Sequence, residues 1–357
     1  MSVPIPGAAR YDAEALRKFI AAVLQTAGVS VSHASLTAQA LVDANLRGVD
    51  THGITRLPIY MKRLGLGAMN PTPNVRVVVD NPTSCVVDGD AGLGQVAMDL
   101  AVRATLERAR AHGMCWTGIR NSSHNGTQGY WALHGAREGM VTLGFTNGES
   151  IMAAWGGSER FLSTNPICIA IPTDPPDELI LDMATSQVAA GHILLALSRG
   201  ESIPQGWALD SEGKDTTNPK GFMDGGTVLP LGGYKGAGLS LMIDILAGVL
   251  SGAASTTDIG GLYWTFDRPQ NVGHALCMID VSRLQPLGQF KRRVGATVAA
   301  MRATTKRPGV DRILAPGDLE RERLVDRTAN GCPLTPDLIR DLTALGTERG
   351  VEFPPPV

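Results

Sequence analysis

The sequence predicts an α/β protein, in which the strands of a central sheet alternate with helices along the chain. From about residue 75 onward, short segments rich in apolar and β-branched residues are separated by longer segments whose apolar residues recur every three or four positions. The composition indicates a chain with a hydrophobic core, because 43% of the residues are hydrophobic and 18% are charged. A length of 357 residues allows two or three lobes.

The first 74 residues are predicted to form a helical lobe. Asp12 can cap a helix that ends at Gly28, and the apolar residues between them have helical spacing: Leu16, Phe19, Ile20, Val23 and Leu24. A second helix is expected to start near residue 32 or 35 and to run to Arg47, and a third begins near Pro58.

Residues 75–314 are predicted to form the α/β body. Strands are expected at residues 75–79, 84–87, 114–120, 141–145, 167–171, 179–182 and 275–279. Helices are expected at residues 95–112, 129–137, 188–198 and 235–250, followed by C-terminal helices around 289–305 and 335–345. The apolar stretch 236–250 has about 15 residues and contains Asp244, so it is too short for a membrane span and predicts a buried helix.

Charge and cysteine content exclude several classes of protein. The net charge is −2 with both signs scattered, which argues against nucleic acid or an anionic membrane as the main partner. The five cysteines are far apart and show no metal-binding spacing, so a reduced, cytoplasmic protein is expected. The N-terminal stretch MSVPIPGAARYDAE lacks the pattern of a signal peptide.

A polar cluster between Leu46 and Arg56, in LRGVDTHGITR, is the first candidate for a functional site. Thr51 lies next to His52, and Arg56 follows four residues later. Histidine titrates nearest to neutral pH, and the guanidinium of arginine can bind a carboxylate with two hydrogen bonds. The stretch therefore predicts a site that holds a carboxylate and exchanges a proton. A capped turn after a helix is the structural alternative.

Three further segments place polar residues or glycines where a strand or loop leads into a helix. They are NSSHNGTQG at 121–129, LDMATS at 181–186 and PLGGYKG at 230–236. Exposed backbone N–H groups at the start of a helix suit a pyrophosphate, and Lys235 adds a cation. Each segment alone could be an ordinary capped loop, but three of them in one chain favour a ligand site.

Residues Gly92–Ala97 fit the G-x-G-x-x-A pattern of dinucleotide-binding proteins and follow a predicted strand. The acidic residue that should bind a ribose hydroxyl is missing, because the next strand ends in Arg120 and Asn121. An arginine there could accept a 2′-phosphate. The residues alone therefore leave open both a dinucleotide loop and a plain strand-to-helix turn.

Taken together, the motifs resemble those of the type-2 malate/L-lactate dehydrogenase family. The family also includes ureidoglycolate and sulfolactate dehydrogenases, diketogulonate reductase and piperideine-2-carboxylate reductases. The resemblance covers about residues 12–325 through these motifs, in order: RGVDTHGITR, NSSHNGTQGY, AAWGG, STNPICIAIP, LDMATS, IPQGWALD, LPLGGYKGAGLSLMIDILAGVLSGA and APGD.

The resemblance implies an NAD- or NADP-dependent oxidoreductase that acts on a small molecule. It implies a homodimer in which helices of the first lobe pack on the partner. The implied fold has a central mixed sheet and is not a Rossmann fold, so Gly92–Ala97 would not hold the cofactor. Residues 315–357 would join the lobe formed by residues 1–74, and a helical subdomain would lie around residues 187–255.

The resemblance also implies roles for individual residues. His52 would exchange a proton with the substrate oxygen or imine nitrogen, with Thr51 beside it, and Arg56 would bind the substrate carboxylate. Thr164 and His124 would contact the substrate. The cofactor would be held by His124, Asn125, Gly126, Thr127, Gln128, Asp182, Met183, Ala184, Ala190, Gly191, Tyr234, Lys235 and, in the APGD segment, Gly317.

Two residues depart from the family pattern. His192 stands where the imine reductases carry an aspartate that polarises the catalytic histidine and where many malate-type members have lysine. A neutral imidazole at this position carries no fixed negative charge, so it cannot polarise the catalytic histidine as the aspartate does. Asn125 replaces a common aromatic residue, which is expected to open or polarise the wall of the pocket.

The main hypothesis is reversible hydride transfer between NAD(P)H and C2 of a small 2-oxo acid, as in malate or lactate dehydrogenation. The alternative is reduction of cyclic or N-alkyl 2-imino acids with NADPH. A metal-dependent hydrolase or lyase built on His52, His124 and Asp182 is a remote alternative, because no local histidine pair supports it. The last alternative is a protein that binds the cofactor but catalyses no reaction.

Overall fold

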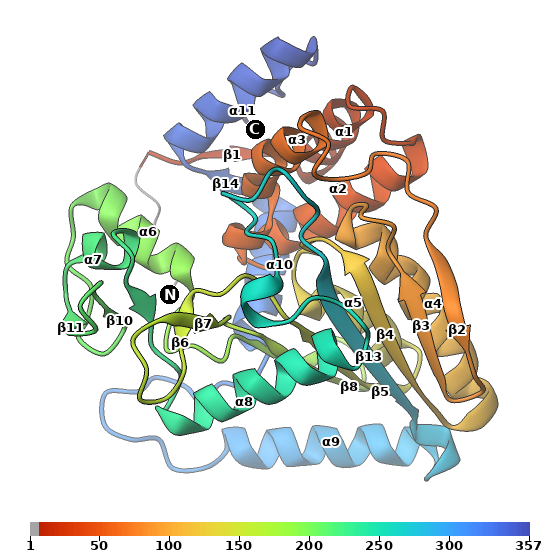
Figure 1. The fold of residues 1–357 in the computed structure, drawn as a ribbon. Coiled ribbons are helices and arrows are strands. Elements are labelled where there is room, and N and C mark those ends of the chain that lie inside the picture. The colour runs from red at the N-terminus through yellow and green to blue at the C-terminus, as the bar shows by residue number, and fades with distance from the viewer. Residues whose placement is uncertain (1–6) are drawn as a thin grey trace.

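A seven-stranded sheet forms the centre of the computed structural model, which describes residues 7–357 (Figure 1). Residues 1–6, part of the stretch for which no signal peptide was predicted, lie outside this range. The strand order is β2-β3-β4-β13-β5-β8-β9. The strands are β2 (Arg76–Asp80), β3 (Ser84–Asp88), β4 (Met114–Ser122), β5 (Met140–Thr146), β8 (Ile167–Ile171), β9 (Leu179–Met183) and β13 (Val272–Asp280). All seven correspond to predicted strands, so the α/β prediction is confirmed.

The sheet is mixed, as the resemblance implied. Strands β3 and β4 are parallel, whereas the other neighbouring pairs of this sheet are antiparallel. A Rossmann fold needs a mostly parallel sheet, so this is not one. Residues 92–97 lead into α4 (Gly94–His112), and their glycines serve close packing. A Cβ atom on Gly94 would collide with the carbonyl oxygen of Ser123, and one on Gly92 would collide with the ring of Pro73.

Helices cover both faces of the sheet. On β13, Leu276 and Met278 belong to the apolar cluster under α4, whereas Ala275 packs with Ile243 and Ala247 on the opposite side. The first face also carries α5 (Gln128–Arg137), and α2 (Val31–Leu46) packs on α4 and α5. The second face carries α8 (Tyr234–Asp244), which continues as the π-helical turn Ile245–Val249. The alternation of strand side chains thus creates two separate cores.

The prediction that residues 236–250 form a buried helix was wrong in one respect. The helical segment exists, but its outer face is exposed and apolar, with Met242 51%, Val249 56% and Leu250 59% accessible. Small residues, such as Ala237 and Ser240, form the buried face instead. The high hydrophobicity of this stretch therefore reflects two apolar faces, of which the sheet covers one.

A second, smaller sheet lies beside the first. Its five strands follow the order β11-β10-β12-β6-β7: β6 (Met152–Ala153), β7 (Arg160–Leu162), β10 (Ala208–Leu209), β11 (Asp215–Thr216) and β12 (Thr227–Val228). Helices α6 (Ala190–Arg199) and α7 (Pro219–Met223) pack next to it. The sequence predicted a helical subdomain around residues 187–255 and missed these strands, because two or three residues are too few to show alternation.

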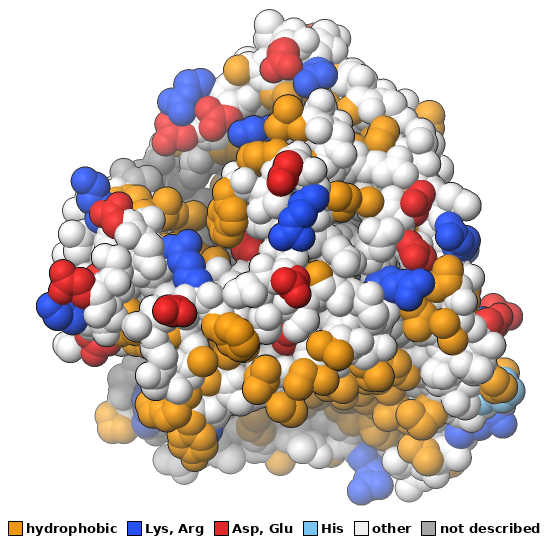
Figure 2. All heavy atoms as spheres, viewed as in Figure 1, with side chains coloured by type: hydrophobic (Ala, Val, Ile, Leu, Met, Phe, Trp, Pro, Cys, Tyr) orange, Lys and Arg blue, Asp and Glu red, His pale blue; other side chains and the backbone are white. Residues whose placement is uncertain are grey.

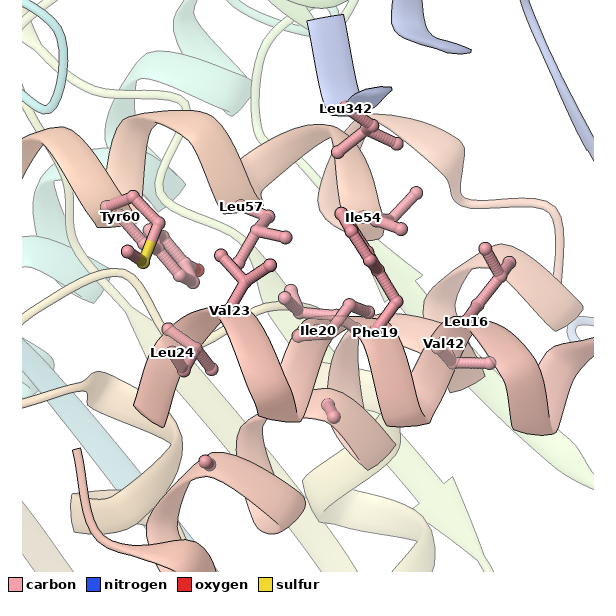
Figure 3. Packing of buried hydrophobic residues seen from close by; sticks show 14 of the residues in the cluster. Leu16, Phe19, Ile20, Val23, Leu24, Val42, Ile54, Leu57, Tyr60 and Leu342 are labelled. Carbon is pink, nitrogen blue, oxygen red and sulfur yellow. The ribbon is translucent and has the colours of Figure 1, made fainter. Parts of the chain in front are cut away.

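The N- and C-terminal segments lie together. Strand β1 (Ala9–Tyr11) pairs with β14 (Cys332–Leu334). Figure 3 shows the apolar side chains of α1 (Ala13–Gln25) facing Leu57 and Tyr60 of α3 (Leu57–Gly65) and Leu342 of α11 (Pro336–Arg349). Helix α10 (Asp318–Asn330) packs against α2, and α9 (Leu287–Arg302) runs along the base of the molecule in Figure 1. A lobe of residues 1–74 with 315–357 stays a prediction.

Candidate active site

The loop that carries His52 and Arg56 is built from two short 3₁₀ turns, Asp50–His52 and Ile54–Arg56. Asn45, fully buried on α2, holds both turns: its amide donates to the Asp50 carboxylate at 2.8 Å and its carbonyl accepts from the Ile54 N–H at 2.8 Å. Arg327 of α10 donates to the same carboxylate at 2.6 and 3.0 Å. Helix α10 thus fixes a loop that lies nearly 280 residues earlier in the chain.

His52 is enclosed by polar and aromatic neighbours. Its Nδ1 lies 3.0 Å from the Thr51 hydroxyl, and its ring stacks on that of His124 with the ring centres 5.3 Å apart. Burial, and then the nearby guanidinium of Arg56, lower the pKa of His52 to about 3. The imidazole is therefore neutral at physiological pH in this state of the protein.

His124 has a defined tautomer. The backbone N–H of Gly126 donates to its Nδ1 at 3.3 Å, so this nitrogen is an acceptor. The Tyr60 hydroxyl lies 2.6 Å from the same nitrogen and accepts a hydrogen bond from Gln95 at 3.1 Å. Tyr60 therefore donates to Nδ1, and the proton of the neutral ring resides on Nε2. Burial, followed by the charge of Arg56, lowers the pKa of His124 well below its usual range.

Arg56 retains an unused donor. One of its terminal nitrogens donates to the Tyr263 hydroxyl, and its guanidinium lies 5.6 Å from the centre of the Tyr263 ring. Its Nε is buried without a hydrogen-bond partner among the described residues. A buried guanidinium N–H without a partner is costly, so this atom indicates a ligand such as a carboxylate.

The loop that carries Tyr263 is held by Arg63, a residue that the sequence analysis missed. Arg63 is fully buried, and its guanidinium donates to five backbone carbonyls: those of Ala68, Gly261, Leu262, Thr265 and Arg268. Nothing in the local sequence distinguishes Arg63 from an ordinary surface arginine. The sequence did contain a signal for Tyr60. Tyr60 follows Arg56 by four residues, as Arg56 follows His52, and this spacing places side chains on the same face of a helix.

Asn125, whose expected effect on the pocket wall stays a prediction, lies beside a further buried histidine. It is buried, and its side-chain amide lies 3.3 Å from His274 Nδ1 on β13. The same nitrogen lies 2.6 Å from the Thr146 hydroxyl, and Nε2 lies 3.0 Å from the Ser122 hydroxyl. Asn125 is thus part of the polar surroundings that a buried histidine requires.

Hydrogen bonds connect the other predicted segments. The Asp182 carboxylate, at the end of β9, accepts from the Gly129 N–H at 2.7 Å. The Thr185 N–H donates to the Thr164 carbonyl and the Leu231 N–H to the Thr185 carbonyl, both at 2.9 Å. These bonds bring segments 124–129, 164, 182–186 and 230–236 together. Asp182 is accessible to solvent, but the surrounding protein raises its pKa to about 6 by desolvation.

The starts of three helices provide groups that fit a dinucleotide. Thr127, Ala189 and Gly233 precede α5, α6 and α8, and none of them caps its helix with a side chain. The free N–H groups at such ends attract phosphate oxygens. Tyr234 and Lys235 are exposed at the start of α8, so a cation accompanies this end. Thr185 Oγ1 is buried without a partner among residues 7–357. These groups fit a nicotinamide dinucleotide.

The remaining predicted residues occupy distinct positions. Met183 and Ala184 are half-buried at the end of β9, and Ala190 is half-buried at the start of α6. Gly126 has φ +84°, which favours glycine. Gln128 is buried and points at the sheet, since a Cβ atom on Gly144 of β5 would lie 3.2 Å from its Oε1.

Gly191 brings α6 against the His52 loop. A Cβ atom at this position would lie 2.9 Å from Thr51 Cγ2. The next side chain, His192, is exposed and makes no hydrogen bond to His52 among the described residues. Gly317 lies at the other end of the site, against β9: the Ile180 N–H donates to the Pro316 carbonyl at 3.2 Å, and a Cβ atom on Gly317 would lie 2.5 Å from the Glu178 carbonyl oxygen.

Residues 7–357 contain no group of three or more His, Cys, Asp or Glu side chains that could hold a metal ion. No helix in the same range is both long and apolar enough to cross a membrane.

Two imidazoles and a guanidinium beside three uncapped helix starts are typical of an oxidoreductase that uses a dinucleotide on an acidic substrate. The family model for malate/L-lactate dehydrogenase matches residues 11–343. Malate dehydrogenase from Pyrococcus horikoshii is 37% identical over 351 residues, 96% of each chain. Its solved structure superimposes with a TM-score of 0.91 and covers 99% of both chains.

Two other relatives differ in the activity and cofactor that their names state. The NAD(+)-dependent ureidoglycolate dehydrogenase of Escherichia coli is 30% identical, covering 92% of this chain and 93% of its own. The NADP(+)-dependent (2R)-3-sulfolactate dehydrogenase of Chromohalobacter salexigens is 36% identical, covering 72% and 77%. The chain belongs to the malate/L-lactate dehydrogenase family. It is an NAD- or NADP-dependent dehydrogenase of hydroxy acids, as the sequence predicted.

Proposed function

We propose that this enzyme interconverts a small 2-hydroxy acid and its 2-oxo acid, with Arg56 binding the substrate carboxylate and His52 carrying the proton. The observation that supports it best is the position of Arg56, whose Nε lacks a partner and whose charge acts on His52. A carboxylate bound to this guanidinium would place C2 of the acid near the imidazole.

His52 is the group that exchanges the proton with the substrate oxygen. Its low pKa keeps the ring neutral in the empty site, so that a ring nitrogen has a lone pair available to accept a proton. For Nε2 to accept a proton from a hydroxyl, Nδ1 must carry hydrogen and donate to the Thr51 hydroxyl at 3.0 Å. A carboxylate on Arg56 offsets the positive charge that opposes protonation, so substrate binding raises the pKa of His52 and also prepares it to act as an acid.

His124 contributes a hydrogen-bond donor. With Nδ1 accepting hydrogen bonds from Tyr60 and Gly126, its Nε2–H is left as the donor of the ring. This donor can hold the substrate oxygen and stabilise negative charge that develops on it. The two stacked imidazoles thus have different tasks, one as base and one as donor.

The bound NAD or NADP supplies the hydride acceptor or donor. The backbone N–H groups at the starts of α5, α6 and α8, together with Lys235, would hold its phosphates. Asp182 would accept from a hydroxyl of the cofactor, and its contact with Gly129 keeps it in position. Met183, Ala184, Ala190 and Gly317 would provide close contact surfaces.

The role of His52 is tested with His52→Gln, and that of Arg56 with Arg56→Lys. His52→Gln should lower kcat by about 10²–10⁴ for every acid and remove the pH dependence assigned to this residue. Arg56→Lys keeps the charge but loses the planar pair of donors, so KM should rise about tenfold or more. Wild-type turnover by His52→Gln with an unchanged pH profile would refute the assignment.

Substrate choice is best measured with one panel. Malate, sulfolactate, ureidoglycolate and lactate, each with NAD and NADP, cover the activities in the names of the relatives. The imine reductase alternative is less well supported, because His192 is exposed and makes no hydrogen bond to His52 among residues 7–357. Pyruvate with and without methylamine, and a cyclic imino acid, complete the panel.

We also propose that the enzyme is a homodimer. Figure 2 shows hydrophobic side chains in a band across the lower half of the face that is seen in Figure 1. Exposed apolar residues of the α8 segment include Leu241, Met242, Ile245, Val249 and Leu250. An exposed apolar face of this kind indicates a protein interface, and it adds to the first-lobe helices that the resemblance implies for the partner contact.

The dimer is tested with Met242→Glu combined with Ile245→Glu. Two charges on the exposed α8 face should reduce the mass in solution to that of one chain, as measured by analytical ultracentrifugation. Leu284→Glu is the control, because Leu284 is 76% exposed and lies outside α8. An unchanged mass in the double variant would place the interface elsewhere.

A cytoplasmic location is proposed from the state of the cysteines. All five (Cys85, Cys115, Cys168, Cys277 and Cys332) are buried free thiols, which suits a reducing compartment. Fractionation of the source cells with an antibody against this chain is the direct test.

A further inference from the structure

His274 is a fully buried histidine on strand β13 that the proposed mechanism does not use. Strand side chains alternate between the two faces of a sheet, so His274 shares a face with Leu276 and Met278, which belong to the apolar cluster under α4. An apolar side chain would fill such a position without partners, whereas a buried imidazole needs hydrogen bonds at its ring nitrogens. The partners of His274 therefore indicate what this histidine does.

The hydrogen bonds of His274 define its tautomer. Its Nε2 lies 3.2 Å from the Ser123 carbonyl oxygen, which can only accept, so Nε2 carries the proton. The Ser122 hydroxyl lies 3.0 Å from the same nitrogen. Nδ1 is then the acceptor, and it faces the Asn125 amide nitrogen at 3.3 Å and the Thr146 hydroxyl at 2.6 Å. The ring is thus neutral and has partners at both nitrogens.

Three of these four partners surround His124 in the chain. Ser122 and Ser123 come directly before it, and Asn125 comes directly after it, where β4 leads toward α5. Nε2 of His274 contacts the preceding residues, and Nδ1 contacts the following one. One imidazole therefore holds both flanks of His124.

The strand that carries His274 is a firm support for this loop. Strand β13 lies inside the seven-stranded sheet, between β4 and β5, and Thr146 is the residue opposite His274 on β5. The pairing of β13 with β4 shifts its register between Val272 and His274. A shift of this kind re-aims the side chains beside it. It falls next to the end of β4, where the His124 loop begins.

We propose that His274 is a positioning residue for His124. It fixes the backbone on both sides of His124, so that this ring stays stacked on His52 with its Nε2–H available to the substrate oxygen. A hydrogen-bond donor stabilises developing charge only when it is held in place beforehand, so a loosened loop costs rate. This inference rests on the proposed function, in which His124 donates to the substrate oxygen.

A double-mutant cycle with His124 tests the inference. His124→Phe keeps a flat ring but removes the donor, and it should lower kcat/KM for the best 2-hydroxy acid by about 10²–10³. His274→Gln retains a donor for Ser123 but loses the acceptor at Nδ1. It should lower kcat/KM about tenfold in the wild-type background and less than about twofold in the His124→Phe background, because a ring without a donor has nothing further to lose.

Two results of the cycle would overturn the inference. One is the same loss from His274→Gln in both backgrounds, which is what a purely structural role would give. The other is a loss of less than about twofold in the wild-type background.

Asn125→Ala and Thr146→Val form a matched pair that leaves His274 in place. Each removes one partner of its Nδ1, but Asn125 belongs to the His124 loop and Thr146 to β5. At saturating cofactor, Asn125→Ala should lower kcat/KM for the acid about tenfold, and Thr146→Val by less than about twofold. Equal losses would contradict the inference, and this comparison decides the question even if His274→Gln does not fold.

Histidine NMR separates this inference from the proposed function. In enzyme labelled with ¹⁵N-histidine, the ring nitrogens of His124 report its tautomer, and they are assigned as the signals lost in His124→Phe. His274→Gln should shift these signals, whereas Thr146→Val should leave them in place. If no 2-hydroxy acid is oxidised, the proposed function fails, yet this shift would still support the role of His274. Unchanged His124 signals in His274→Gln would refute that role, even in an active enzyme.

Discussion

The proposed mechanism gives two neighbouring imidazoles different roles because their Nδ1 atoms have different partners. His52 faces a hydroxyl that can accept or donate, while His124 faces the N–H of Gly126 and the hydroxyl of Tyr60. The donor on the backbone is fixed, so the tautomer of His124 is fixed as well. In the proposed mechanism, a single backbone contact therefore decides which histidine can serve as the base.

Tyr60→Phe tests this assignment at the level of one hydrogen bond. The variant leaves the His124 ring less firmly held and Gln95 without its acceptor, so kcat/KM should fall about tenfold, equivalent to ~1.4 kcal/mol. Steady-state assays should show the loss with the acid as varied substrate, with no change in NADH affinity measured by fluorescence.

Tyr130→Phe is the control for this prediction. Tyr130 lies on α5, and its hydroxyl makes no hydrogen bond among residues 7–357. Equal losses in the two variants would mean that the Tyr60 hydroxyl has only a packing role.

At the scale of elements, the start of α8 is positioned by close contact between backbones. The absence of a side chain at Gly236 lets the helix approach the loop before it and the segment after β9. A Cβ atom at 236 would lie 2.5 Å from the Leu231 nitrogen and 2.6 Å from the Thr185 carbonyl oxygen. The predicted phosphate-binding end of α8 is thus set by a glycine that itself binds nothing.

Gly236→Ala should therefore shift the whole helix start. Because the obstructing atoms are backbone, we expect a loss of ~1–3 kcal/mol in the free energy of unfolding and a weaker affinity for NADH. Urea denaturation and fluorescence titration measure the two effects.

Gly238→Ala is the matched control for Gly236→Ala. It lies one half-turn further along the helix, and its Cβ atom would meet nothing within 4 Å. This variant should be unchanged or more stable by up to ~1 kcal/mol, because alanine favours helix. Similar destabilisation of both variants would contradict the steric argument.

The main elements could be predicted because each repeats its pattern over several residues. The central strands and the helices that cover them have clear periodicity, and the glycine after α4 marks its end with φ +92°. The strands of the small sheet could not be found, since two or three residues are too few to show alternation. Helix α10 was missed because its outer residues are mostly charged.

At the scale of the molecule, buried histidines couple folding to pH. His274 lies in the core between Thr146 and Ser122, and burial lowers its pKa to about 4. A histidine with a lowered pKa stabilises the fold fully above its unfolded value of about 6.5. That contribution is lost as the pH falls through the window between 6.5 and 4, because only the unfolded chain binds the proton.

The enzyme should therefore become less stable in mild acid. Between pH 7.5 and pH 5, His274 alone should cost ~2 kcal/mol in the free energy of unfolding, and His52 and His124 add to the loss. Urea denaturation at both pH values measures the difference. His274→Gln should show a smaller dependence on pH, and an equal dependence would assign the effect to other groups.

The sequence by itself determined the fold class and the family, and it predicted the main site residues, because periodicity and short motifs are local properties of the chain. Thr51, His52 and Arg56 lie within six residues, and each helix start carries its own signal. The tertiary structure decided which groups act on them. Arg63 and Arg327 reach the site from other elements. Contacts between distant segments depend on packing, which no local pattern encodes.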